Sequence, residues 1–170
     1  KMASNKEIKI AADDIVSLIK SARLCTYQAN RDGRGGVAID HQTKEQILIP
    51  QNADNHAIDG DEVAVINDGV DKHGKPQGVV RDIIKHKITI LVGRVEQYKD
   101  KYYLLSDNEK LSHYPVVIED VNQALAGDEI YSAHVTSYPS SEQSYFKVKV
   151  IQSLGHLGDD EVFVNKVLIE

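Results

Sequence analysis

Apolar residues recur at every second position in many short runs along the chain, as at Ile47 and Ile49. Alternation at period two predicts a β-strand with one buried face. Glycine, asparagine and aspartate separate the runs, as expected of turns between short strands. The strand-like runs are 23–30, 36–40, 46–50, 61–67 and 78–85 in the first half and 90–97, 102–107, 115–119, 128–136 and 145–152 in the second. The pattern therefore predicts a mainly β protein.

The chain also matches itself at an offset of 67 residues. GVAID at 36–40 aligns with YLLSD at 103–107, and AIDGDEV at 57–63 aligns with ALAGDEI at 124–130. The alternative is chance matching between strand-rich segments. Five short strands in about 67 residues fit a small closed barrel of the OB type. We therefore predict two five-stranded OB-type barrels in tandem, the first over residues 23–90 and the second over 91–158.

The shared Gly-Asp pair before the fourth strand of each copy predicts a turn. Gly60-Asp61 and Gly127-Asp128 occupy equivalent positions. Such a turn needs a residue with positive φ, which glycine adopts freely, followed by a side chain that can cap it.

The segment before the first barrel has a different period. Its apolar residues recur at helical spacing and predict one amphipathic α-helix over residues 1–22, packed on the first barrel. These apolar positions are Ile8, Ala11, Ala12, Ile15, Leu18 and Ile19.

The glycine-rich stretch RDGRGGVAID at 31–40 raises the question of a phosphate-binding loop. It has neither the GxxxxGK[ST] pattern of a P-loop nor GxGxxG opening a helix. A strand follows it, and Asp-Gly is a strong hairpin signal. We therefore interpret the stretch as the turn of a hairpin.

Composition limits the possible function classes. The formal net charge is −6, which counts against nucleic-acid binding overall but permits a local basic surface. The lone Cys25 allows neither an internal disulfide nor a CxxC zinc pair, and we interpret it as an apolar filler. No apolar run is long enough to span a bilayer, so we expect no membrane association and a cytoplasmic location.

Strands two and three of single-strand-binding barrels carry the outward residues on which bases stack. We expect Val37 and Ile39 to point into the first barrel, so that Gly36 and Ala38 point outward. At the offset of 67, Tyr103 takes the place of Gly36 and is the predicted stacking ring. The alternative for Tyr103 is an ordinary exposed strand residue. The predicted nucleic-acid contacts are Arg31, Arg34, Lys44 and Leu48 in the first barrel and Arg94, Lys99, Lys101 and Tyr103 in the second.

RDGRGGVAID followed by QILIP resembles the two RNA-binding motifs of cold-shock domains. The order of helix, two barrels with GDE turns, and LGHLGDDEVFVNKVLIE resembles the N-terminal part of the ribonuclease II/R family of exoribonucleases. The resemblance covers about residues 5–170, and ILVGRVEQYKDKYYLLSD carries the character of the second cold-shock domain. It departs from the family at Arg34 and Gly36, where aromatic residues are usual, and at Leu48, where phenylalanine is usual.

This resemblance implies a function for the whole parent protein. The two barrels would bind single-stranded RNA, while a later domain hydrolyses it from the 3′ end with magnesium held by clustered aspartates. Residues 159–170 would begin the connection to that missing catalytic domain. The partners implied are single-stranded RNA and the catalytic and C-terminal OB domains of the parent chain. No cofactor is expected in this segment.

Two other functions stay open from the residues. The barrels could form a docking module for a protein partner, which the negative net charge and the missing aromatics favour. A hydrolase within this segment is weakest, because no acid, base or metal set can be assembled. The scattered histidines lack HxH or HExxH spacing. We therefore expect no catalytic residue and no metal site here.

Overall fold

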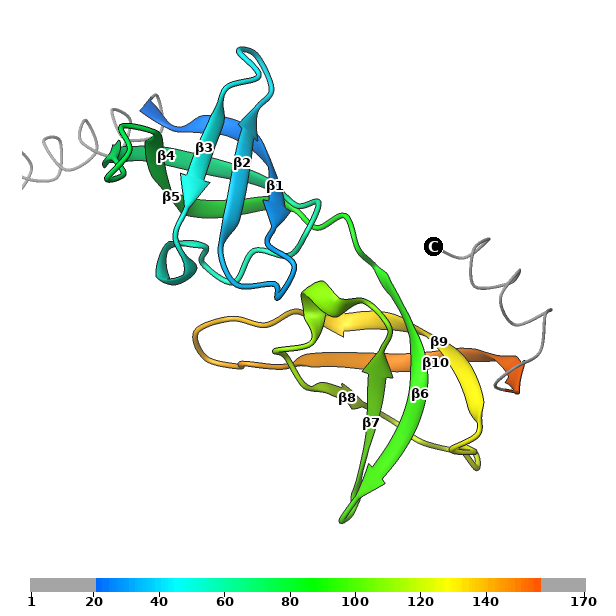
Figure 1. Ribbon diagram of the computed structural model, residues 1–170. Coiled ribbons are helices and arrows are strands. Elements are labelled where there is room, and N and C mark those ends of the chain that lie inside the picture. Colours follow the sequence, from blue (N-terminus) through cyan, green and yellow to red (C-terminus); the bar gives the residue numbers. More distant parts are fainter. Residues whose placement is uncertain (1–20, 157–170) are drawn as a thin grey trace, which may run out of the picture.

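The computed structural model describes residues 21–156, which form two closed β-barrels joined by residues 86–89 (Figure 1). The predicted mainly β fold with two five-stranded barrels is confirmed. The predicted helix over 1–22 and the connection over 159–170 lie outside the described residues, apart from 21 and 22.

The first barrel closes in the order β1-β2-β3-β5-β4, and β3 and β5 are its one parallel pair. A short 3-10 turn, η1, follows β3. The core of the first barrel contains Cys25, Tyr27, Ile47, Val63 and Val65, all 0% exposed. The elements are β1 (Arg23–Ala29), β2 (Gly36–Asp40), β3 (Gln46–Ile49), η1 (Gln51–Ala53), β4 (Glu62–Val70) and β5 (Pro76–Lys85).

The predicted orientation of β2 is wrong by one residue. Ala38 is fully buried, whereas Val37 and Ile39 are half-buried on the outer face. Ala38 lies opposite Tyr27 on one side and Ile47 on the other, so these two large side chains already fill the interior beside it. Only a small residue fits there, and the larger aliphatic residues of β2 must point outward.

The second barrel repeats the topology in the order β10-β8-β7-β6-β9, with β8 and β10 parallel. Its core is built around Leu104, Tyr131, Phe146 and Val148, and Ile58 of the first barrel joins the same cluster. The elements are β6 (Ile90–Tyr98), β7 (Lys101–Ser106), the 3-10 turn η2 (Glu109–Leu111), β8 (Val116–Ile118), β9 (Glu129–Ser137) and β10 (Phe146–His156).

The two Gly-Asp turns differ in conformation. Gly60 has φ +89°, as predicted, and the fully buried Asp61 accepts a hydrogen bond from the Ile58 backbone N–H at 2.8 Å. Gly127 does not adopt a positive φ, so the prediction fails for the second copy. Asp128 remains largely exposed there and therefore does not cap a buried turn.

Candidate nucleic-acid interface

The outer face of β6 and β7 carries the residues predicted for the second barrel. On β7, Tyr102 packs against the core, whereas Tyr103 points the other way. Tyr103 lies opposite Glu96 on β6, and Arg94 lies opposite Leu105. Because side chains alternate along a strand, Arg94, Tyr103 and Leu105 share one face.

A hollow of about 530 Å³ lies beside Tyr103. One wall is the outer face of β6 and β7, and the other is the segment from 111 to 116, which leads into β8. Aromatic and aliphatic side chains make up most of the lining. They include Tyr98, Tyr103, Leu105, Leu111, His113, Tyr114 and Pro115. A hollow of this kind suits the flat face of a nucleobase, since bases stack on aromatic rings irrespective of sequence.

Three exposed cations lie on β6, β7 and the turn between them, although none of the three lines the hollow itself. Lys99 lies in the β6–β7 turn with φ +56°, and its Nζ is 5.4 Å from the centre of the Tyr98 ring. Arg94 and Lys101 project from the two strands. Within residues 21–156, none of the three is in an ion pair at 4 Å or less. The carboxylates of Glu96 and Asp100 lie on the same two strands and their turn, so the local charge is mixed.

The first barrel brings two of its four predicted residues next to the second. Arg31 and Arg34 line a second hollow of about 620 Å³ together with Asn30 and Asp32. Glu109 and Ser112 of the second barrel complete its lining, and Ser112 also lines the hollow beside Tyr103. The two hollows therefore adjoin at Ser112.

The other two predicted residues lie elsewhere. Lys44 is exposed in the β2–β3 turn with φ +63°, and Figure 1 shows this turn at the end of the first barrel remote from the second. Leu48 is half-buried on the outer face of β3, directly opposite Val37. Val37, Leu48 and Ile39 give this face an aliphatic surface without a ring.

The sequence prediction missed Tyr98, His113 and Tyr114 of the hollow. The Tyr114 hydroxyl lies 2.9 Å from His56 Nδ1, and burial, with a smaller effect of Asp54, raises the pKa of Tyr114 to about 12. Burial, followed by the nearby Arg34 charge, lowers the pKa of His113 below its usual value. The lowered pKa favours the uncharged form of His113, which offers an aromatic ring to the hollow.

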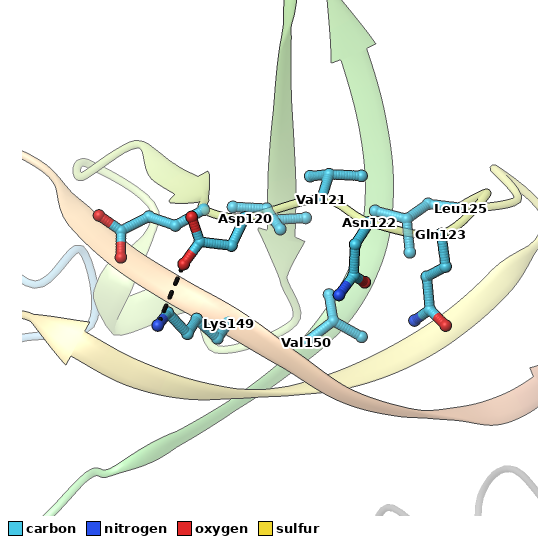
Figure 2. A pocket seen from close by; sticks show the side chains of 9 residues that line it. Asp120, Val121, Asn122, Gln123, Leu125, Lys149 and Val150 are labelled. Carbon is cyan, nitrogen blue, oxygen red and sulfur yellow. Dashed lines mark ion pairs between the residues drawn. The ribbon is translucent and has the colours of Figure 1, made fainter.

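A third hollow, of about 290 Å³, lies on a different part of the second barrel (Figure 2). Glu119, Asp120 and Val121 line it from the connection after β8, and Val150 lines it from β10. Lys149 Nζ is paired with Asp120 Oδ2 at 3.1 Å, as Figure 2 shows. The carboxylates leave this hollow without free positive charge, so it is a poor site for a phosphate.

Other site types find no support in the part of the chain that the structure describes. Residues 21–156 contain no group of three or more histidine, cysteine, aspartate or glutamate side chains placed to hold a metal ion. No helix in this range has the length and apolar character needed to cross a membrane. Cys25 is buried, and desolvation raises the pKa of its thiol to about 11, so it is a poor nucleophile.

Known proteins with similar sequences or folds also contain OB barrels of the kind seen here. Residues 25–83, which make up most of the first barrel, match the family described as Ribonuclease B OB domain. No curated protein sequence matches the chain. The match to the OB domain family confirms, for the first barrel, the resemblance to the N-terminal OB region of the ribonuclease II/R family.

Solved structures extend the likeness in fold to both barrels. Mycoplasma genitalium RNase R, in complex with ribose-methylated single-stranded RNA, matches with TM-score 0.71 and 18% identity over 87% of this chain and 23% of its own. Yeast Ssd1, described as a pseudonuclease, matches with TM-score 0.69 and 12% identity over 92% of this chain and 26% of its own. The chain thus spans about a quarter of the length of these proteins, and at such identities the likeness concerns the fold.

Proposed function

We propose that the two barrels bind single-stranded RNA and form the N-terminal RNA-gripping region of a 3′-5′ exoribonuclease. The observation that carries this proposal is the hollow beside Tyr103, because the strands that supply its Tyr98 and Tyr103 rings also carry three cations. These are Arg94 and Lys101 on the strands and Lys99 in the turn between them. Bases would stack on the rings while the cations follow the phosphates. The OB family match and the RNase R structure with bound RNA support the proposal.

The second part of the proposal concerns the parent protein. Hydrolysis would take place in a separate catalytic domain, with magnesium held by clustered aspartates of that domain. The two barrels would deliver the strand to it, in contact with that domain and with a C-terminal OB domain. A cytoplasmic location goes with this role and stays an expectation.

RNA binding is tested by fluorescence anisotropy with a labelled single-stranded RNA, titrated against residues 1–170 at several salt concentrations. A duplex of the same sequence is the control. We expect preference for the single strand and weakening with salt, because counterion release accompanies phosphate contacts. Absence of binding at low salt would contradict the proposal.

One observation favours a second function, a docking module for a protein. The outer face of the first barrel presents Val37, Ile39 and Leu48, which are aliphatic and cannot stack bases as rings do. This face suits apolar contact with a protein surface better than contact with RNA. The same titration separates the two functions, because a docking module has no affinity for the single strand.

A further inference from the structure

The turn between β1 and β2 approaches the second barrel too closely to carry a side chain at Gly33. This glycine is buried and has φ +78°. A Cβ atom there would overlap the backbone carbonyl oxygen of Lys110 and would lie 2.6 Å from Cε1 of His113. Both belong to the second barrel, and the Lys110 carbonyl is backbone, which cannot rotate away. Residue 33 therefore sets how closely the barrels approach.

Side chains reinforce this contact from both sides. Lys110 Nζ lies 3.2 Å from Asp59 Oδ1, and Arg31 Nε lies 3.1 Å from Glu109 Oε2. Exposed ion pairs of this kind contribute little by themselves. They do fix which residues face each other, and the 2.9 Å hydrogen bond of His56 to Tyr114 adds a half-buried polar contact.

The strongest cohesion comes from Ile58. This residue belongs to the connection between β3 and β4 of the first barrel, yet it is 2% exposed and packs within the core cluster of the second. An isoleucine removed from water in this way is a substantial apolar contribution. The first barrel is thus anchored in the second by a core residue rather than by surface contact alone.

The linker is fixed to both barrels as well. His86 Nδ1 lies 2.9 Å from the buried Asp61 of the first barrel. Its ring stacks on Tyr138 of the second, with centres 3.6 Å apart and planes 7° from parallel. The Tyr138 hydroxyl donates to the Ile88 carbonyl at 2.7 Å. The linker between the barrels is therefore held along its length.

We propose that the glycine turn at 31–35 is a docking element that holds the barrels in one orientation and thereby joins the two hollows into a single groove. Arg31 and Arg34 stand at one end of this groove, Tyr103 at the other, and Ser112 where the hollows meet. The ligand is one single strand long enough to contact both barrels. The orientation follows from the contacts alone, whereas the ligand rests on the proposed RNA binding.

The orientation is tested without RNA. Spin labels on Asp68→Cys and Asp100→Cys report one inter-barrel distance, because both positions are exposed and Cys25 is buried. We compare Gly33→Ala with the matched control Gly74→Ala. Gly74 has φ +80° and no atom within 4 Å of an added Cβ, so both variants strain the backbone alike and only Gly33→Ala meets the second barrel.

We expect the control to keep the narrow distance distribution of the unsubstituted protein and Gly33→Ala to shift or broaden it. An unchanged distribution in Gly33→Ala would overturn the proposal. Should Gly33→Ala not fold, Ile58→Ala withdraws the apolar side chain that anchors the first barrel in the second, and a shift or broadening of the distance distribution is again expected. An unchanged distribution in that variant would count equally against it.

The joined groove is tested with two RNA lengths. A strand of about 4 nucleotides fits one barrel, and one of about 12 reaches both. We expect Gly33→Ala to weaken binding of the longer strand about tenfold or more, because its two contacts no longer act together, and to change binding of the shorter strand by much less. Equal loss for both lengths, or none, would overturn the joined groove. If the unsubstituted protein binds neither strand, the proposed function fails, while the distance measurement still decides the orientation.

Discussion

Single side chains divide into those that shape the hollow and those that stabilise the barrels. Tyr103 is half-exposed and lines the hollow. Asp40 is not a candidate contact, and its carboxylate is held by hydrogen bonds and an ion pair at the end of β2. Asp40 accepts backbone hydrogen bonds from Gln42 and Thr43 and pairs with Arg23 at 2.6 Å. Substitution of Tyr103 is therefore expected to change RNA binding, whereas substitution of Asp40 is expected to change stability.

Replacing Tyr103 removes the proposed stacking ring. We expect Tyr103→Ala to weaken single-stranded RNA binding by about 1–3 kcal/mol, the usual value of one base stacked on an aromatic side chain. Tyr103→Phe keeps the ring and should bind normally. Anisotropy titrations of both, with Tyr145→Ala outside the hollow as a control, check this. An Ala variant with unchanged affinity would exclude Tyr103 from the contact.

Asp40 makes the stability of the first barrel depend on pH. The hydrogen bonds from Thr43 and Gln42, followed by Arg23, lower the pKa of Asp40 from 3.8 to about 2. Because the folded-state pKa is depressed, the stabilisation is complete above the unfolded value and is lost as pH falls from about 4 to 2. We expect the difference in unfolding free energy between the protein and Asp40→Asn to narrow over this range.

The matched control is Asp68→Asn, at an exposed position of β4. The difference in unfolding free energy between Asp68→Asn and the unsubstituted protein should not narrow as the pH falls from about 4 to 2. If the difference in unfolding free energy between the unsubstituted protein and Asp40→Asn stayed constant down to pH 2, the stabilising role of the Asp40 carboxylate would be contradicted. Denaturant titrations at several pH values measure it.

At the scale of elements, period-two alternation predicted the strands and both barrels, but not the phase of β2. In GVAID the larger aliphatic residues Val37 and Ile39 form one alternating set and Gly36, Ala38 and Asp40 the other, so the pattern favours the wrong face. The interior beside Tyr27 and Ile47 makes the choice, and it admits only Ala38. The sequence prediction also missed His113 and Tyr114. They lie in the loop between η2 and β8, where no regular alternation indicates the direction of a side chain.

The phase of β2 has a direct test. Ala38→Leu inserts atoms beside Tyr27 and Ile47 and should destabilise the barrel by about 1–3 kcal/mol. Val37→Leu on the outer face should change stability by no more than about 0.5 kcal/mol. Urea unfolding of both variants measures the two values, and the reverse order would restore the orientation expected from sequence.

At the scale of the whole molecule, the charge of −6 hides an uneven distribution. Several cations are neutralised locally: Arg23 by Asp40 and Glu45, Lys147 by Glu119 and Lys149 by Asp120. Within residues 21–156, Arg34, Arg94, Lys99 and Lys101 are in no ion pair, whereas Arg31 has only its exposed pair with Glu109 to exchange for a phosphate. The sequence predicted these cations from the expected strand faces in the first barrel and from the 67-residue offset in the second. The contact of Arg34 with the second barrel depends on long-range packing that no local pattern contains.

The salt dependence of binding reports how many of these cations meet phosphate. Each contact with a single strand contributes about −0.7 to the slope of log affinity against log salt. Contacts from Arg94, Lys99 and Lys101 alone predict a slope of about −2, and adding Arg31 and Arg34 predicts about −3.5. Anisotropy at four or more salt concentrations distinguishes these values. A slope near zero would leave no cation in contact with phosphate.

The burial of Ile58 in the neighbouring core also bears on the order in which the molecule is made. Synthesis proceeds from the N-terminus, so the first barrel is complete before β10, which supplies Phe146 and Val148 to the core around Ile58. Until then this isoleucine stays uncovered, and an uncovered apolar side chain invites association with other chains. The second barrel therefore covers this residue only once its last strand has been synthesised.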